Sequence, residues 1–186
     1  MYTYRKYDSA VETEQQWWDR TRSWKSVYHE TGHVWFATRS GWPVKFVTVD
    51  PKVHKNRNAN GLTELYSFPA PIPAMLLSYV MAGKVCERLV LPRWLWSLSM
   101  MGGYYSDVEK ASDYLEHDCG VTSLRRQNKV LCEAEAEVRA LVTQPPFRDE
   151  IDRLAEALME FQTLTGTQVR AILGLDQGVA LSPSGD

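Results

Sequence analysis

The stretch that decides the fold is Val27-Tyr-His-Glu-Thr-Gly-His-Val-Trp-Phe36, which lies inside a run without proline from Thr13 to Arg39. Apolar residues recur at helical spacing through this run, which predicts one long helix or two abutting helices. His29 and His33 stand four positions apart, so they project from the same face of such a helix. The sequence therefore predicts a helix that presents two imidazoles side by side.

These two histidines enclose Glu30 in the pattern His-Glu-x-x-His, which has a defined chemistry. Both imidazoles can reach one ion at about 2.0–2.1 Å, the usual zinc–nitrogen distance. Glu30 can contact a zinc-bound water without being a ligand, and can take its proton as the water attacks a carbonyl. Chance produces this pattern in about one in two hundred chains of this composition. We therefore expect a Zn²⁺ site with Glu30 as general base, rather than a helix whose histidines are only packed or solvated.

A catalytic zinc site needs a third protein ligand and an open position for water. The two remaining histidines, His54 and His117, fall in a predicted loop and late on a predicted helix. The acids Glu87, Asp107 and Asp113 are better placed, because each falls on or at the start of a helix that could pack against the motif helix. Spacing alone leaves these alternatives open.

The rest of the chain predicts further helices and a β-hairpin. Gly41-Trp-Pro43 ends the first helix, residues 44–49 alternate like a half-buried strand, and residues 62–66 can pair back after a turn-rich segment. Helices are expected over residues 73–91, 106–119 with Ser106 as cap, 123–143, 147–163 and 166–173. The predicted fold class is mainly α (α+β), with a small sheet or hairpin next to the motif helix. We expect a single domain over residues 1–174 and a flexible tail over residues 175–186.

Composition and charge narrow the class of protein. The 21 basic and 23 acidic residues are mixed along the chain, which leaves no basic stripe for nucleic acid. The most apolar stretch, residues 69–83, contains three prolines and is shorter than the roughly 20 residues that cross a bilayer, so we expect no membrane anchor. The N-terminus lacks a secretory signal, and three widely spaced cysteines form no disulfide or zinc pattern. We expect reduced core thiols and a cytoplasmic location.

The motif and several further segments resemble the peptidase domain of FtsH, the family of ATP-dependent zinc metalloproteases, over much of residues 26–173. The matching segments are Tyr28-His-Glu-Thr-Gly-His33, Trp42-Pro-Val-Lys-Phe-Val-Thr-Val49, Ala82-Gly-Lys-Val-Cys-Glu-Arg-Leu89, Gly103-Tyr-Tyr-Ser-Asp107 with Ala111, and the Leu-Thr-Gly spacing within Leu158–Leu173. The resemblance implies that Asp107 completes the metal site. Glu87 is the alternative ligand, or a residue that supports the ligands from behind.

The resemblance also implies a helical metallopeptidase domain whose small sheet receives an extended substrate at its edge strand by backbone pairing. The residues expected to form that edge strand are Val44, Phe46, Val47, Thr48 and Val49.

The chain departs from the family in two respects. It has no Gly-x-x-x-x-Gly-Lys-Ser/Thr phosphate loop, so the family's motor is missing from this sequence. Tyr104 and Tyr105 stand where the family more often has small residues, and we expect them to pack against the motif helix or to donate a hydroxyl to an oxyanion.

The function expected from these patterns is a zinc metallopeptidase that cleaves short or unfolded polypeptides, alone or with a separate ATPase or unfoldase. The family's ring-forming habit implies self-association into a homo-oligomer. The alternative is a catalytically inactive relative that acts as a binding or regulatory module.

Overall fold

Helices and one small sheet make up the part of the chain that the computed structural model describes, residues 8–54, 61–67, 73–93, 96 and 103–175. The elements follow one another as α1 (Glu14–Arg39), β1 (Val44–Thr48), α2 (Pro51–His54), β2 (Leu62–Leu65), α3 (Pro73–Val90), α5 (Gly103–His117), α6 (Leu124–Val142), α7 (Pro145–Phe161), β3 (Thr163–Thr165) and α8 (Gly166–Ile172). This confirms the predicted mainly helical α+β class.

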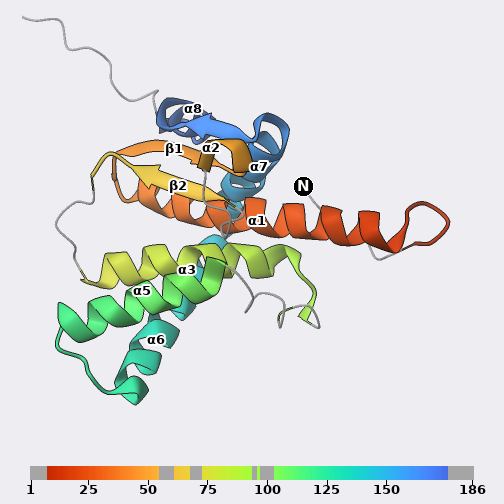
Figure 1. Ribbon diagram of the computed structural model, residues 1–186. Helices are drawn as coiled ribbons and strands as arrows, with labels where there is room; N and C mark the ends of the chain where they lie inside the picture. Colours follow the sequence, from red (N-terminus) through yellow and green to blue (C-terminus); the bar gives the residue numbers. More distant parts are fainter. Residues whose placement is uncertain (1–7, 55–60, 68–72, 94–95, 97–102, 176–186) are drawn as a thin grey trace, which may run out of the picture.

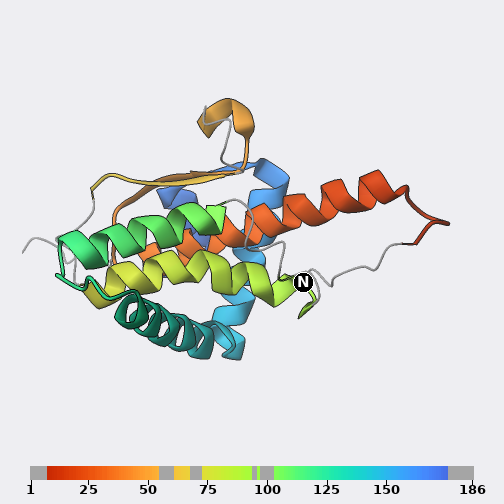
Figure 2. The ribbon, with the colours of Figure 1, turned by 60° about the horizontal axis from the view of Figure 1, so that its bottom comes forward.

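Helix α1 is the centre of the fold. The sheet and α8 lie on one side of it, and α3, α5 and α6 lie on the other (Figure 1). The same two layers are visible when the molecule is turned (Figure 2). The whole predicted run forms a single helix, which begins at a capping box in which Thr13 and Gln16 satisfy each other's backbone N–H groups.

Helix α7 fixes the rotation of α1 about its own axis. The hydroxyl of Tyr28 donates to Asp152 over 2.6 Å, and the indole N–H of Trp35 donates to Glu150 over 2.9 Å. Tyr28 and Trp35 are seven residues apart and so lie on one face of α1. Because both pairs are buried, they hold this face against α7 and leave the motif histidines facing elsewhere.

The sheet differs from the prediction in one respect that bears on function. Strands β1 and β2 form the expected antiparallel pair, but β3 pairs with the other side of β1, and the strand order is β2-β1-β3. The prediction that residues 44–49 form an edge strand is therefore wrong, because neighbouring strands occupy both sides of β1. Of the residues expected to pair with substrate, Phe46, Val47 and Thr48 pair with both neighbours, Val44 pairs with Leu65 of β2, and Val49 follows β1 and donates its backbone N–H to Gln162.

Several element boundaries also differ from the prediction. Strand β3 begins at Thr163, the last residue of a predicted helix, and continues over two residues for which no element was predicted, and α2 falls in a segment predicted as turns. The backbone of α5 begins at Gly103, so Ser106 lies within the helix and does not cap it. Pro145 and Pro146 form the first turn of α7, where the missing N–H of proline costs nothing.

The apolar core has two parts that share α3 and α6. The larger part joins α1, β1, α3, α7, β3 and α8 to the C-terminal end of α6. The smaller part joins α3 to α5 and α6, and it contains Leu77, Val80, Met81, Ala111, Leu115, Leu131 and Ala134. Helix α5, which carries Asp107, therefore packs in a different apolar cluster from α1.

Among the described residues, no helix combines the length and the apolar character that crossing a membrane requires. All three cysteines are free thiols. Cys86 is buried, and this burial raises its pKa to about 12. Cys119 is half-buried and Cys132 is exposed, so the prediction of core thiols holds for Cys86 alone.

The contact between α1 and α7 can be tested with Tyr28→Phe, which removes the hydroxyl that Asp152 accepts from. We expect the free energy of unfolding to fall by about 1.5–3 kcal/mol, because a buried hydrogen bond to a charged group is lost. Urea denaturation measures this change. The matched control is Tyr66→Phe, since the Tyr66 side chain is 72% exposed and its loss of a hydroxyl should cost less than about 0.5 kcal/mol. Equal effects of the two substitutions would contradict the role of this contact.

Candidate metal centre

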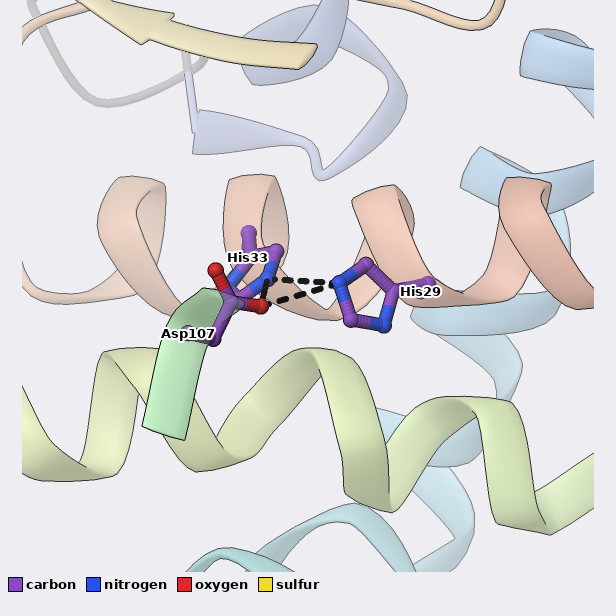
Figure 3. A group of neighbouring side chains, drawn as sticks. All are labelled: His29, His33 and Asp107. Atoms are coloured by element: carbon purple, nitrogen blue, oxygen red, sulfur yellow. Dashed lines mark hydrogen bonds and ion pairs between the residues drawn. The ribbon is translucent and has the colours of Figure 1, made fainter. Parts of the chain in front are cut away.

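Three side chains from two helices converge on one point. His29 and His33 come from α1, Asp107 comes from α5, and all three point toward one another (Figure 3). The Nε2 atoms of the two rings are 3.1 Å apart, and each lies 3.1 Å from Oδ2 of Asp107. In the described part of the chain this is the group of histidine, cysteine and acid side chains whose ligand atoms could hold a metal ion.

The size of this triangle fits a zinc ion. A tetrahedral ion with bonds of about 2.0–2.1 Å places its ligand atoms about 3.3 Å apart, close to the 3.1 Å found on each side of the triangle. Two imidazoles and one carboxylate suit zinc and other first-row transition metals, and three protein ligands leave a fourth position open. The geometry and the donor set are therefore compatible with zinc or another first-row transition metal.

The opposite edge of each imidazole faces a hydrogen-bond acceptor on α3. Nδ1 of His33 lies 2.9 Å from the carbonyl oxygen of Tyr79, and Nδ1 of His29 lies 3.3 Å from Oε2 of Glu87. With a metal ion at the centre, each Nδ1 would carry the ring hydrogen and each Nε2 would direct its lone pair at the ion. Glu87 contacts His29 on the side opposite the triangle, which agrees with one of the two roles that the sequence left open.

Three lone pairs that meet at one point repel one another unless a cation or a proton lies between them. Burial on its own lowers the pKa of His29, but hydrogen bonds to Asp107 and Glu87 outweigh this effect and raise the pKa to about 10. Burial alone would raise the pKa of Asp107, yet the charge of His33 and hydrogen bonds to both rings hold it well below its usual range. The centre attracts positive charge, and an arriving metal ion would displace a proton.

Two glycines make room for the imidazoles against α3. A Cβ atom at Gly83 would lie 2.5 Å from Nε2 of His33 and 3.0 Å from Cε1 of His29. A Cβ atom at Gly32 would lie 2.2 Å from the carbonyl oxygen of Ala82. Any larger residue at either position would push α1 away from α3 or displace the rings, so this close approach sets the geometry of the centre.

Glu30 lies next to the triangle and is held by the sheet. Its side chain is buried, and its charge helps to raise the pKa of His29, after the effects of Asp107 and Glu87. The hydroxyl of Thr63 on β2 donates to Oε2 of Glu30 over 2.9 Å. Glu30 is therefore a buried carboxylate held beside the three candidate ligands.

The structure separates the remaining candidates from the triangle. Asp113 and His117 lie on α5 with exposed side chains, which places them in solvent rather than at the centre. His54 ends α2, but its side chain lies outside the described residues. Tyr104 and Tyr105 lie in the first turn of α5, where the structure describes the backbone alone, so their packing and oxyanion roles stay predictions.

Sequence reasoning missed the residues that surround the ligands. Thr63, Gly83 and the backbone carbonyl of Tyr79 each contact a motif residue. Gly83 stands in one of the segments that resemble the FtsH peptidase, and this was the one signal that pointed to it. A carbonyl group and a single threonine leave no pattern in a sequence.

Comparison with protein-family models and with curated proteins finds no match to this chain. The resemblance to the FtsH peptidase domain stays a prediction that rests on the motifs quoted above.

The close contact between Gly83 and the His33 ring allows a test of the metal centre. Gly83→Ala should weaken zinc binding by about 10–100-fold, the usual cost of disturbing the support of a ligand, because the new methyl group displaces the His33 ring. Competition with a zinc-binding dye measures the affinity. Since alanine by itself favours a helix over glycine by about 0.5–1 kcal/mol, helix content by circular dichroism should not fall. Unchanged zinc affinity would contradict the tight fit of the rings against α3.

Zinc should also secure α5, because Asp107 joins α5 to α1 across the two apolar clusters. At a hundredfold excess over its Kd, zinc stabilises the bound form by about 2.7 kcal/mol, so amide hydrogen exchange in α5 should slow by up to about a hundredfold. Hydrogen-exchange mass spectrometry with and without zinc measures this effect. Asp107→Asn should abolish the protection, and Asp113→Asn, on the same helix but exposed, should retain it. Protection that survives Asp107→Asn would exclude Asp107 as the link.

Proposed function

We propose that this chain is a zinc-dependent metallopeptidase that hydrolyses peptide bonds in short or unfolded polypeptides. The observation that supports the proposal best is the triangle of His29, His33 and Asp107, with 3.1 Å between each pair of ligand atoms. Glu30 lies beside it as a buried carboxylate. A structural zinc site uses four protein ligands, whereas three ligands and an adjacent base are the arrangement of a hydrolase.

Each residue then has a defined task in the reaction. Zinc held by the three ligands would supply Lewis acidity, which polarises a carbonyl and acidifies water. Glu30 accepts a proton from the attacking water as its oxygen bonds to the carbonyl carbon. Glu30 then returns the proton to the amide nitrogen as the carbon–nitrogen bond breaks, which releases a carboxylic acid and an amine. Glu87 and the Tyr79 carbonyl keep both imidazoles in the tautomer that faces the centre.

The outer edge of β2 is the surface we propose for substrate pairing, in place of β1. Within the described part of the chain, β2 pairs with β1 on one side alone. Its residue Thr63 contacts Glu30, so an extended peptide added to this edge would run beside the general base. Backbone pairing of this kind accepts extended chains and excludes folded ones, which agrees with a preference for unfolded polypeptides.

The partners and location proposed for the chain rest on its sequence. An ATPase or unfoldase on a separate chain would supply unfolded substrates, and a homo-oligomer follows from the resemblance to ring-forming proteases. A cytoplasmic location agrees with three cysteines that form no disulfide.

The decisive experiment replaces Glu30 with Gln. This substitution keeps the size of the side chain but removes the group that accepts a proton, so cleavage of casein by the zinc-loaded protein should fall by about 10²–10⁴-fold. Zinc content, measured by atomic absorption, should stay unchanged because Glu30 is not a ligand. Glu116→Gln is the control, since Glu116 is an exposed acid on α5. A wild-type protein that holds zinc and cleaves neither casein nor short peptides would overturn the proposal in favour of a binding or regulatory module.

A further inference from the structure

We propose that Thr63 is a positioning residue for the general base: its hydroxyl holds one oxygen of Glu30 and leaves the other to water. This inference rests on the proposed function, since it assigns a residue to the same reaction. The hydroxyl of Thr63 contacts Glu30. It acts through Glu30, and the consequence is that strand β2 sets the direction in which the base points.

The position of Thr63 in the sheet carries the first part of the argument. Thr63 stands opposite Val47 in the register of β1 and β2, and residues directly opposite each other share one face of a sheet. Val47 is 1% exposed and belongs to the main apolar cluster. Thr63 therefore lies on the face of the sheet that covers α1, while its neighbour Glu64 faces the other way and pairs with the exposed Lys45.

The hydroxyl of Thr63 is a polar group on the face of the sheet that packs against α1. Valine has the same shape as threonine and would fill the same space without a polar group, whereas a buried hydroxyl destabilises the protein unless it is hydrogen-bonded. The partner of this hydroxyl is Glu30, with Oε2 at 2.9 Å and the Glu30 carbonyl oxygen at 3.4 Å. The shorter contact is the hydrogen bond that fixes the carboxylate.

The second oxygen of Glu30 is left for the reaction. The hydrogen bond from Thr63 goes to Oε2 and not to Oε1. A Cβ atom at Gly61, the residue before β2, would lie 2.9 Å from Oε1 and 2.4 Å from Cγ of Glu30. The base is therefore fitted at two points, with a donor at Thr63 and bare backbone at Gly61. A carboxylate held in this way can accept a proton from water without first reorienting.

The test is Thr63→Val, which removes the hydroxyl and keeps the volume, assayed on the zinc-loaded full chain with a fluorogenic unstructured peptide. We expect kcat to fall about tenfold, because a disordered base loses part of the 10²–10⁴-fold that general-base catalysis contributes. KM should stay within about twofold, because substrate binding at the outer edge of β2 is unaffected. Thr63→Ser restores the hydroxyl and should recover most of kcat.

The matched control is Thr163→Val on β3, which removes a threonine hydroxyl from the other side of the same sheet. That hydroxyl bonds to Thr48 rather than to Glu30, so kcat should be unchanged. Equal losses in the two valine variants, or a Thr63→Val protein with the kcat of the wild type, would overturn the role of Thr63. Should Thr63→Val not fold, Thr63→Ala removes the same hydroxyl, and full activity there has the same meaning.

The same assay separates this inference from the proposed function. A wild-type chain that binds zinc but cleaves nothing overturns the hydrolase and, with it, the task of Thr63. An active wild type with a fully active Thr63→Val overturns the positioning role alone. Zinc content of every variant should equal that of the wild type, because Thr63 supports the base and not the ligands.

Discussion

The close approach of α1 to α3 is the constraint on which the rest of the structure depends. Gly32 and Gly83 carry no side chain at the point of contact, so the two motif imidazoles lie directly against the α3 backbone. At that short distance α3 supplies the Tyr79 carbonyl and the Glu87 carboxylate, and these acceptors orient both rings. The packing of the two helices thus orients the ring nitrogens that face the centre, and this orientation does not require a bound ion. The buried contacts with α7 hold α1 in the rotation that makes this packing possible.

The motif half of the centre could be predicted from the sequence, because its chemistry is local. Histidines one helical turn apart must share a face, so His29 and His33 needed nothing beyond a correct helix assignment. Asp107 lies 74 residues beyond His33, and spacing could not separate it from Glu87 or Asp113. Its choice came from a resemblance, and the structure gives the physical reason: Asp113 faces solvent, and Glu87 approaches His29 from the side away from the triangle.

The sheet shows where sequence patterns fail. The hairpin of β1 and β2 was predictable because alternating residues flank one turn-rich segment, but β3 has three residues and lies directly between two helices. A strand this short has no periodicity to detect, and its pairing with β1 joins distant segments. Because β3 was not predicted, the central strand β1 was predicted to be an edge strand. Thr63 was missed for a similar reason. Its importance comes from a contact with Glu30 on another element, and no pattern in its own segment indicates that contact.

The pairing of Thr48 with Thr163 spans 115 residues, and it has a consequence for the order of assembly during protein synthesis. The helix with both histidines is translated before α7 and β3, which hold α1 and β1 in place. Domains that depend on contacts of this range complete their folding only when the last partner is available. A nascent chain therefore carries the motif before its centre can form, and the peptidase we propose would be inert until α7 and β3 had left the ribosome.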